Sequence, residues 1–264
     1  MIVLGGSSRQ SLAALRVALD NTLKGVSADD ASAISSGLFK ALVAIDSSTG
    51  LRRALTDSAR DASSKSDLVS DLFKKSLTGP VLSLLATATG LGWSSPSGIA
   101  DAIEQIAVEA EATAANLGNS LDQVQSEIFT FSKLLIENPD LRTALSERAQ
   151  SPESKQALLK SIFGSKFSAS TISLLSHSVE SRRARSIEKT IAAYSHAVTA
   201  RRNRVNAHIK SSIALSDVQA KKLADSLTKQ IGQPVHLNIE IDPSILGGIS
   251  IRFGDEVIDG TISN

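Results

Sequence analysis

Histidines are few in this chain and cysteines are absent, and the spacing of the histidines fits no catalytic or metal site. The four histidines are His177, His196, His208 and His236, and none stands in the His-Glu-x-x-His pattern that holds zinc on a helix. The chain has no cysteine, which excludes disulfides, thiolate ligands and cysteine nucleophiles. It also has no P-loop and no Gly-x-Ser-x-Gly elbow. We therefore expect no catalytic residue, no metal and no cofactor.

Three aspartates and a glycine pair near the C-terminus could be mistaken for site residues. Asp242, Asp255 and Asp259 occupy turn positions, where an aspartate accepts hydrogen bonds from nearby backbone N–H groups. Gly247-Gly248 is not followed by a helix start, so it lacks the dipole that binds a phosphate. We expect a bulge or a close backbone approach there instead.

The one cluster of a single charge is a basic run between residues 182 and 210. Its members are Arg182, Arg183, Arg185, Lys189, Arg201, Arg202, Arg204 and Lys210. The whole chain is nearly neutral, with 28 Lys and Arg against 27 Asp and Glu, and only 3% of it is aromatic. A nucleic-acid partner is therefore not expected. The run is either the solvated face of a long helix or a surface that docks an acidic helix.

No segment of the sequence predicts insertion into a membrane. The longest weakly polar stretch, residues 79–93, is too short for a span and is broken by Pro80 and two glycines. Met1–Gly6 lacks the basic start and the long apolar core of a signal peptide. Association with a membrane should therefore come through a partner.

The C-terminal third contains the clearest strand pattern. From Val235 to Ile241 aliphatic residues alternate with polar ones, which is typical of a half-buried strand. Further strands are expected at 249–253 and 256–262, and the two residues between them fit a tight hairpin.

The residues before this segment predict one more strand and a helix. The alternation at 205–213 indicates the strand, and Ser216-x-x-Gln219 is a capping box for a helix that ends near Ile231. The expected order is strand, helix, strand, strand, strand in a small α+β module.

The end of the chain resembles the C-terminal signature of the delta subunit of F-type ATP synthases, called OSCP in mitochondria. That signature is a hydrophobic strand, Asp-Pro-Ser-x-x-Gly-Gly, a strand with Arg, Gly-Asp, and Ile-Asp-Gly-Ser/Thr. The matching residues are Asp242, Pro243, Ser244, Gly247, Gly248, Arg252, Gly254, Asp255, Ile258, Asp259, Gly260 and Thr261. In that family a further helix usually follows, whereas this sequence ends at Asn264.

An internal repeat organises the rest of the chain. Leu51–Phe73 aligns with Leu141–Phe163 at an offset of 90 residues, and the same offset pairs Phe39 with Phe129. We read a duplicated helical domain in which a long helix at 97–117 is shared by both copies. The predicted fold is mainly α, with two tandem six-helix-bundle-type domains followed by the α+β module. The predicted domains are 1–96, 97–200 and 201–264.

The resemblance implies a non-catalytic peripheral-stalk, or stator, subunit that resists the torque of the rotor. In the family the helical bundle binds the N-terminal segment of an α subunit of the α3β3 head, and the C-terminal domain binds the C-terminal end of the b (and b′) subunits. The implied location is peripheral, on the cytoplasmic face of a bacterial cell membrane. The rival interpretation is a helical adaptor unrelated to ATP synthase.

Two sets of residues are candidates for these contacts. A groove for the α-subunit helix is predicted at apolar positions with helical spacing: Val124, Ile128, Phe131, Ile172 and Leu175. The same period is typical of bundle core, so the pattern leaves both readings open. Contacts with b are expected at the basic residues Arg201, Arg202, Arg204 and Lys210.

Overall fold

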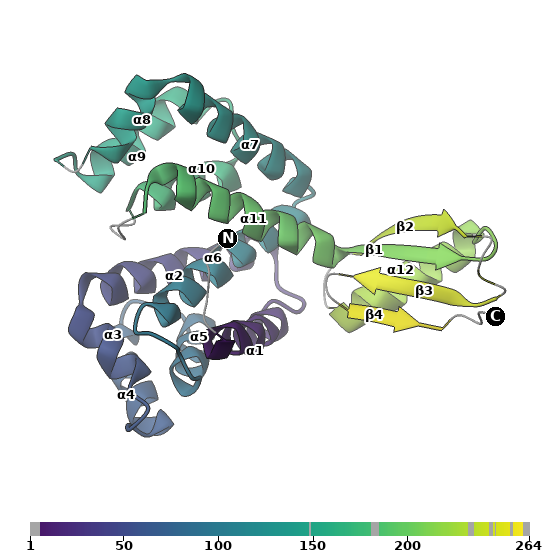
Figure 1. The fold of residues 1–264 in the computed structure, drawn as a ribbon, viewed down its shortest axis with the longest axis horizontal. Helices are drawn as coiled ribbons and strands as arrows, with labels where there is room; N and C mark the ends of the chain where they lie inside the picture. Colours follow the sequence, from purple (N-terminus) through teal and green to yellow (C-terminus); the bar gives the residue numbers. More distant parts are fainter. Residues whose placement is uncertain are drawn as a thin grey trace. The chain divides into compact units, whose positions relative to one another are not determined.

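The computed structural model describes residues 6–147, 149–180, 185–231, 235–242, 245, 247–253 and 256–260, which form twelve helices and four strands (Figure 1). They divide into two compact units, Met1–Val198 and Thr199–Asn264. The first is helical, and the second contains a small mixed sheet. The mainly helical fold with a C-terminal α+β module is thus confirmed.

Eleven helices begin in the first unit. Their bounds are α1 Gly6–Thr22, α2 Ala28–Ser47, α3 Thr49–Thr56, α4 Ala62–Phe73, α5 Gly79–Gly90, α6 Gly98–Leu117, α7 Leu121–Glu137, α8 Pro139–Ser146, α9 Pro152–Phe163, α10 Ala169–Glu180 and α11 Ile187–Val205. Serine side chains cap two of these helix starts: Ser27 accepts from the Asp30 N–H and Ser151 accepts from the Ser154 N–H.

The helix bounds follow the 90-residue offset of the sequence repeat. Helices α3, α4 and α5 coincide with α8, α9 and α10 in both their first and last residues when 90 is added. We call α1 to α5 the first half of this unit and α7 to α11 the second half, with α6 between them. Equivalent positions are buried in both halves, as in Leu55 and Leu145 or Phe73 and Phe163. A buried lysine recurs as well, at Lys65 and Lys155. Both halves nevertheless belong to one compact unit.

Helix α6 forms the centre of the helical unit. It contacts α1, α2 and α5 on the first half and α7 and α10 on the second (Figure 1). All its residues except Asp101, Gln105 and Leu117 are buried. Its many alanines leave little side-chain bulk, so neighbouring helices approach closely on every side. A Cβ at Gly98, its first residue, would lie 2.9 Å from the Ser8 Oγ of α1.

The second unit contains the strands β1 Asn206–Ser211, β2 His236–Ile241, β3 Ile249–Phe253 and β4 Glu256–Asp259, with helix α12 Asp217–Ile231 between β1 and β2. The strand order is β2-β1-β3-β4, with β1 parallel to β2 and the other pairs antiparallel. The expected order of elements is confirmed. So is the capping box, because the Ser216 N–H donates to the Gln219 side chain at 3.0 Å and the Gln219 N–H donates to Ser216 Oγ at 3.4 Å.

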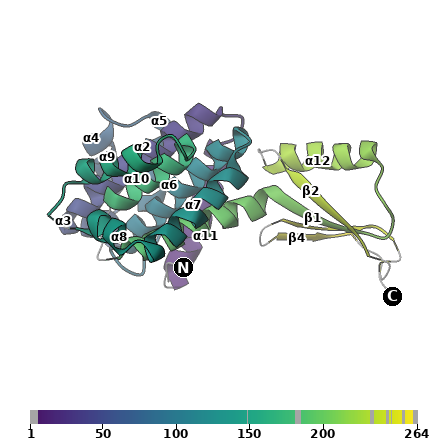
Figure 2. The same ribbon diagram turned by 90° about the horizontal axis from the view of Figure 1, so that it is seen from above.

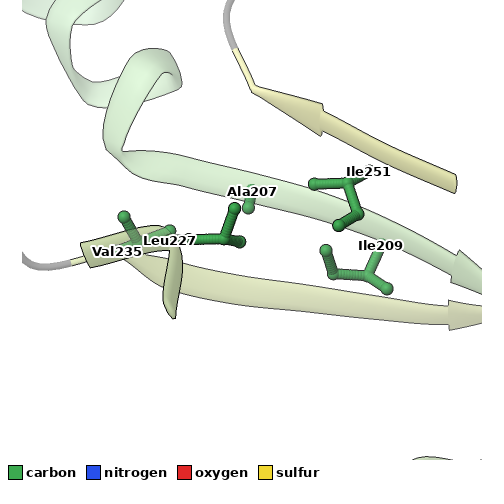
Figure 3. Packing of buried hydrophobic residues seen from close by; sticks show 5 residues of the cluster. All are labelled: Ala207, Ile209, Leu227, Val235 and Ile251. Atoms are coloured by element: carbon green, nitrogen blue, oxygen red, sulfur yellow. The ribbon is translucent and has the colours of Figure 1, made fainter. Parts of the chain in front are cut away.

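One face of this sheet packs against α12 (Figure 2). The buried cluster is Ala207, Ile209, Leu227, Val235 and Ile251 (Figure 3). Ile239 and Ile258 lie on the same face, because their register partners are Ile209 and Ile251. They are still 39% and 42% exposed, since one helix does not cover four strands.

Candidate partner-binding sites

The three histidines whose side chains the structure describes do not assemble into a chemical centre. The imidazole of His177 stacks on Phe39 with ring centroids 4.0 Å apart, and its Nδ1 lies 2.8 Å from Glu180 Oε2. His196 and His208 are exposed, and the side chain of His236 lies outside the described residues. Over the part of the chain that the structure describes, no three His, Asp or Glu side chains are placed to hold a metal ion.

The predicted α-subunit groove lies in the bundle core. Val124, Ile128, Phe131 and Leu175 are at most 1% exposed, and Ile172 is half-buried. Phe131 packs edge-on against Phe163, with ring centroids 5.4 Å apart. A partner helix would reach these four side chains only if the bundle opened. These four residues therefore occupy core positions, which is the reading that the shared helical period had left open beside a groove.

The basic residues predicted to contact b differ in how far they are buried. Arg201 is only 2% exposed and Arg202 is half-buried, so neither presents its full charge to a partner. The Arg204 side chain lies outside the described residues. Lys210 is exposed, and its Nζ lies 3.4 Å from Asp242 Oδ2. Of the predicted set, Lys210 alone is shown to be accessible.

The signature residues that are described have backbone roles. Gly248 has φ +84°, a conformation that favours glycine, and Gly260 donates its N–H to the Ile249 carbonyl at 3.0 Å. The Asp242 N–H donates to the Ser211 carbonyl at 2.9 Å, which joins the ends of β1 and β2. Gly247 and Asp259 lie within or beside the sheet, and Arg252 is exposed on β3. Pro243, Gly254 and Asp255 lie outside the described residues.

An apolar stripe on α7 was not predicted. Phe129 and Ile136, two turns apart on one helix face, are each 70% exposed. The repeat counterpart of Phe129 is Phe39 on α2, which is 2% exposed because α10 covers it through His177. The same helix face is therefore covered by a helix in the first half and open in the second. The repeat alignment paired the two phenylalanines but gave no sign of this difference.

A second apolar surface occupies one end of the C-terminal unit. We call it the β-end patch: Ile213, Val218, Ile239 and Ile241, which are 67%, 65%, 39% and 54% exposed. Ile241 pairs with Ser211 in the sheet, and the chain continues from there through Ile213 into α12. The alternation at 235–241 showed which residues share a face, but not that α12 would leave this end uncovered.

Three buried carboxylates fix α6 between its neighbours. Glu109 receives the guanidinium of Arg16 on α1 at 2.7 Å, and Glu111 accepts from Ser32 on α2 at 3.0 Å. Glu104 has its partners in the second half of the unit. It pairs with Arg185 and accepts a hydrogen bond from the Tyr194 hydroxyl of α11 at 3.2 Å.

Two cavities lie between the first and second halves of the helical unit. The larger, about 790 Å³, has Phe39 and Leu42 of α2 on one side and His177 and Glu180 of α10 on the other. Burial acts to raise the pKa of Glu180, but hydrogen bonds from His177 and Gln156 and the charge of His177 outweigh it, so the pKa lies below its ordinary value. The smaller cavity, about 190 Å³, is lined by α1, α6 and α11.

Comparison with known proteins identifies the family. The family model described as ATP synthase delta (OSCP) subunit matches residues 108–264, and that match begins inside α6. The ATP synthase subunit delta of Streptomyces coelicolor is 36% identical over 98% of this chain and 94% of its own length. The proteins of that name from Streptomyces griseus and Thermobifida fusca are 35% and 36% identical over 98% of this chain, covering 96% and 95% of their lengths.

The chain belongs to the ATP synthase delta (OSCP) subunit family, which is a structural, non-catalytic component of F-type ATP synthase. Its relatives align over nearly the whole chain, so the first half, which precedes the family-model match, has a counterpart in them. The complex is membrane-associated. None of the helices in the described ranges is long and apolar enough to cross a bilayer.

Proposed function

We propose that this protein is a peripheral-stalk subunit that ties the α3β3 head to the b subunits, at the cytoplasmic face of a bacterial membrane, and so keeps the head from turning with the rotor. The family assignment supports a place in the complex. The mechanical role rests on one further observation, the burial of α6.

A stator element has to transmit force without bending between its parts. Helix α6 is continuous from Gly98 to Leu117 and is packed on opposite sides by both halves of the helical unit. Its buried carboxylates hold Arg16 in one half and Arg185 in the other. A packed core resists deformation far better than an exposed linker does, so the two halves behave as one stiff body.

The β-end patch suits the b subunits. Its four aliphatic side chains form an exposed surface on the module that the family uses for b. An amphipathic helix would cover such a surface with its apolar stripe. We place the b contact there, rather than on the arginines expected from the sequence.

The α7 stripe suits the N-terminal helix of an α subunit. In the first half the equivalent face is already covered by a helix, α10, which stacks His177 on Phe39. The open face at Phe129 and Ile136 is therefore accessible to a partner helix, and these two apolar residues stand two turns apart.

Calorimetric titrations with two variants test both assignments. The intact chain would be titrated with a synthetic α-subunit N-terminal peptide and with a C-terminal fragment of b, both from the same genome. We expect Phe129→Ser to weaken binding of the α-subunit peptide by about tenfold or more and to leave binding of b unchanged, since it removes most of a side chain that the bound peptide would bury. We expect Ile213→Ser with Ile241→Ser to do the reverse. The assignments would be refuted if neither variant lost affinity for a partner, or if each variant lost affinity for both partners.

A further inference from the structure

The smaller cavity lies beneath a groove that neither proposed contact uses. Its floor is apolar and buried, formed by Leu12 of α1, Val108 of α6 and Ala197 of α11. Tyr194 closes one side, and its hydroxyl is held by Glu104 at 3.2 Å. Because the cavity needs a helix from each half and the shared helix between them, it exists only where both halves are present.

The size of the cavity matches one large apolar side chain. Its volume is about 190 Å³. An apolar cavity of about 150 Å³ accommodates a benzene molecule, so this one takes a phenyl ring or a leucine side chain. Ala193, half-buried on α11, borders it and leaves room for a neighbouring backbone to approach.

Basic side chains stand at the rim of the groove. Arg9 on α1 and His196 on α11 both line the opening and are exposed. Lys189 is exposed on the same face of α11 as Ala193 and His196, at i, i+4 and i+7. The remaining cation of the lining, Arg16, is already bound to Glu109, and the one carboxylate of the lining, Glu104, is buried beneath the rim with Arg185.

We propose that this groove docks an acidic amphipathic helix from a partner protein, which inserts one aromatic or leucine side chain into the cavity and places carboxylates beside Arg9, His196 and Lys189. The apolar cavity supplies the anchor, and the rim fixes the sign of the flanking charges. The contact lies outside both the β-end patch and the α7 stripe, so it gives the complex a third point of attachment.

A defined peptide tests this surface on the intact chain. The probe is a fluorescein-labelled, alanine-based helix of about 16 residues, long enough to form about four turns. It carries one central Phe with Glu residues one turn before and after it. Fluorescence anisotropy should show saturable binding that weakens as the salt concentration rises. Replacing the Phe by Ala, or the Glu residues by Lys, should weaken binding by about tenfold or more.

Protein variants separate the anchor from the rim. Ala193→Phe fills the cavity and should abolish binding, while Arg9→Glu with Lys189→Glu should weaken it by about tenfold or more. Arg53→Glu, an exposed charge reversal on α3, is the matched control and should leave binding unchanged. A thermal melt of each variant confirms that it is folded.

Three results would overturn the proposal. They are the absence of saturable binding by the parent peptide, equal binding of all the peptides, and undiminished binding to folded Ala193→Phe. Preferential binding to vesicles of phosphatidylglycerol, with no response to the peptide, would show that the rim recognises an anionic surface instead.

Discussion

At the scale of single residues, Glu127 shows how two copies of one sequence pattern diverge. Its carboxylate caps the start of α10, because the Ser168 N–H donates to Oε2 at 2.9 Å and the Ser168 hydroxyl donates to the same atom at 2.7 Å. The repeat counterpart is Gly37, where a Cβ would lie 2.8 Å from Val81 Cγ2. The first half packs a valine against the backbone at the point where the second half uses a charged cap.

Replacing Glu127 by Gln should cost about 1–2 kcal/mol of unfolding free energy, the usual range for a lost helix cap. Chemical denaturation at neutral pH measures it. Glu137→Gln is the matched control on the same helix, since Glu137 forms only an exposed pair with Lys133 at 3.6 Å and should change stability by less than about 0.5 kcal/mol. Equal effects of the two changes would contradict the capping role.

The same residue should make the free energy of unfolding depend on pH in the acid range. Burial acts to raise the pKa of Glu127, but hydrogen bonds from Thr171, Ser168 and Gln123 outweigh it and hold the pKa below the ordinary value of 4.5. A depressed pKa adds stability above the unfolded-state value, and that stability is lost as the pH falls through the folded-state value. The difference between wild type and Glu127→Gln should therefore shrink below about pH 4.5. A difference in unfolding free energy between the two proteins that stays constant down to pH 3 would contradict this prediction.

At the scale of elements, the sequence predicted helix positions better than helix surroundings. The helix expected at 97–117 is α6, Gly98–Leu117, and the helix expected to end near Ile231 is α12, which ends there. Which face of a helix is covered depends on neighbours from distant segments, and no local pattern encodes that.

The candidate site shows the same limit. Periodicity placed Val124 and Phe131 on one face of α7, and that face is core. The accessible stripe on the opposite side contains Phe129, which looks no different in sequence from its buried counterpart Phe39. Charge runs were equally ambiguous, because Arg201 is buried in a segment that reads as a solvated basic face.

The junction between the halves should depend on the buried pair of Glu104 and Arg185. Glu104 is 1% exposed, so Glu104→Gln removes a buried negative charge from the side of the Arg185 guanidinium. We expect a loss of about 2–3 kcal/mol of unfolding free energy, measured by denaturant titration. Asp71→Asn, which breaks an exposed pair with Lys74 at 2.7 Å, should cost less than about 1 kcal/mol. If Glu104→Gln costs no more stability than Asp71→Asn, the pair of Glu104 and Arg185 does not stabilise the junction.

At the scale of the whole molecule, the first half is part of the core and not an appendage. Deleting residues 1–96 removes every contact of α6 with α1, α2 and α5. It also leaves Glu109 and Glu111 without Arg16 and Ser32. We expect the helical unit of the remaining fragment to lose its cooperative thermal transition or to aggregate. Circular dichroism and light scattering measure this, and an unchanged transition would show that the first half is only a spacer.

The C-terminal unit should survive that deletion. Its buried cluster, from Ala207 to Ile251, consists of residues of the unit itself. Methyl resonances of Ile209 and Leu227 should therefore keep their dispersion in the fragment. Their collapse would show that this unit depends on the first half.

The central claim is that one chain connects two other subunits of the ATP synthase. Sedimentation velocity of the intact protein, mixed with a labelled α-subunit N-terminal peptide and a differently labelled C-terminal fragment of b, tests it most directly. The account predicts one species that carries both labels at once, with each partner binding equally well in the presence of the other. Competition between the two partners, or failure of either to sediment with the protein, would contradict it.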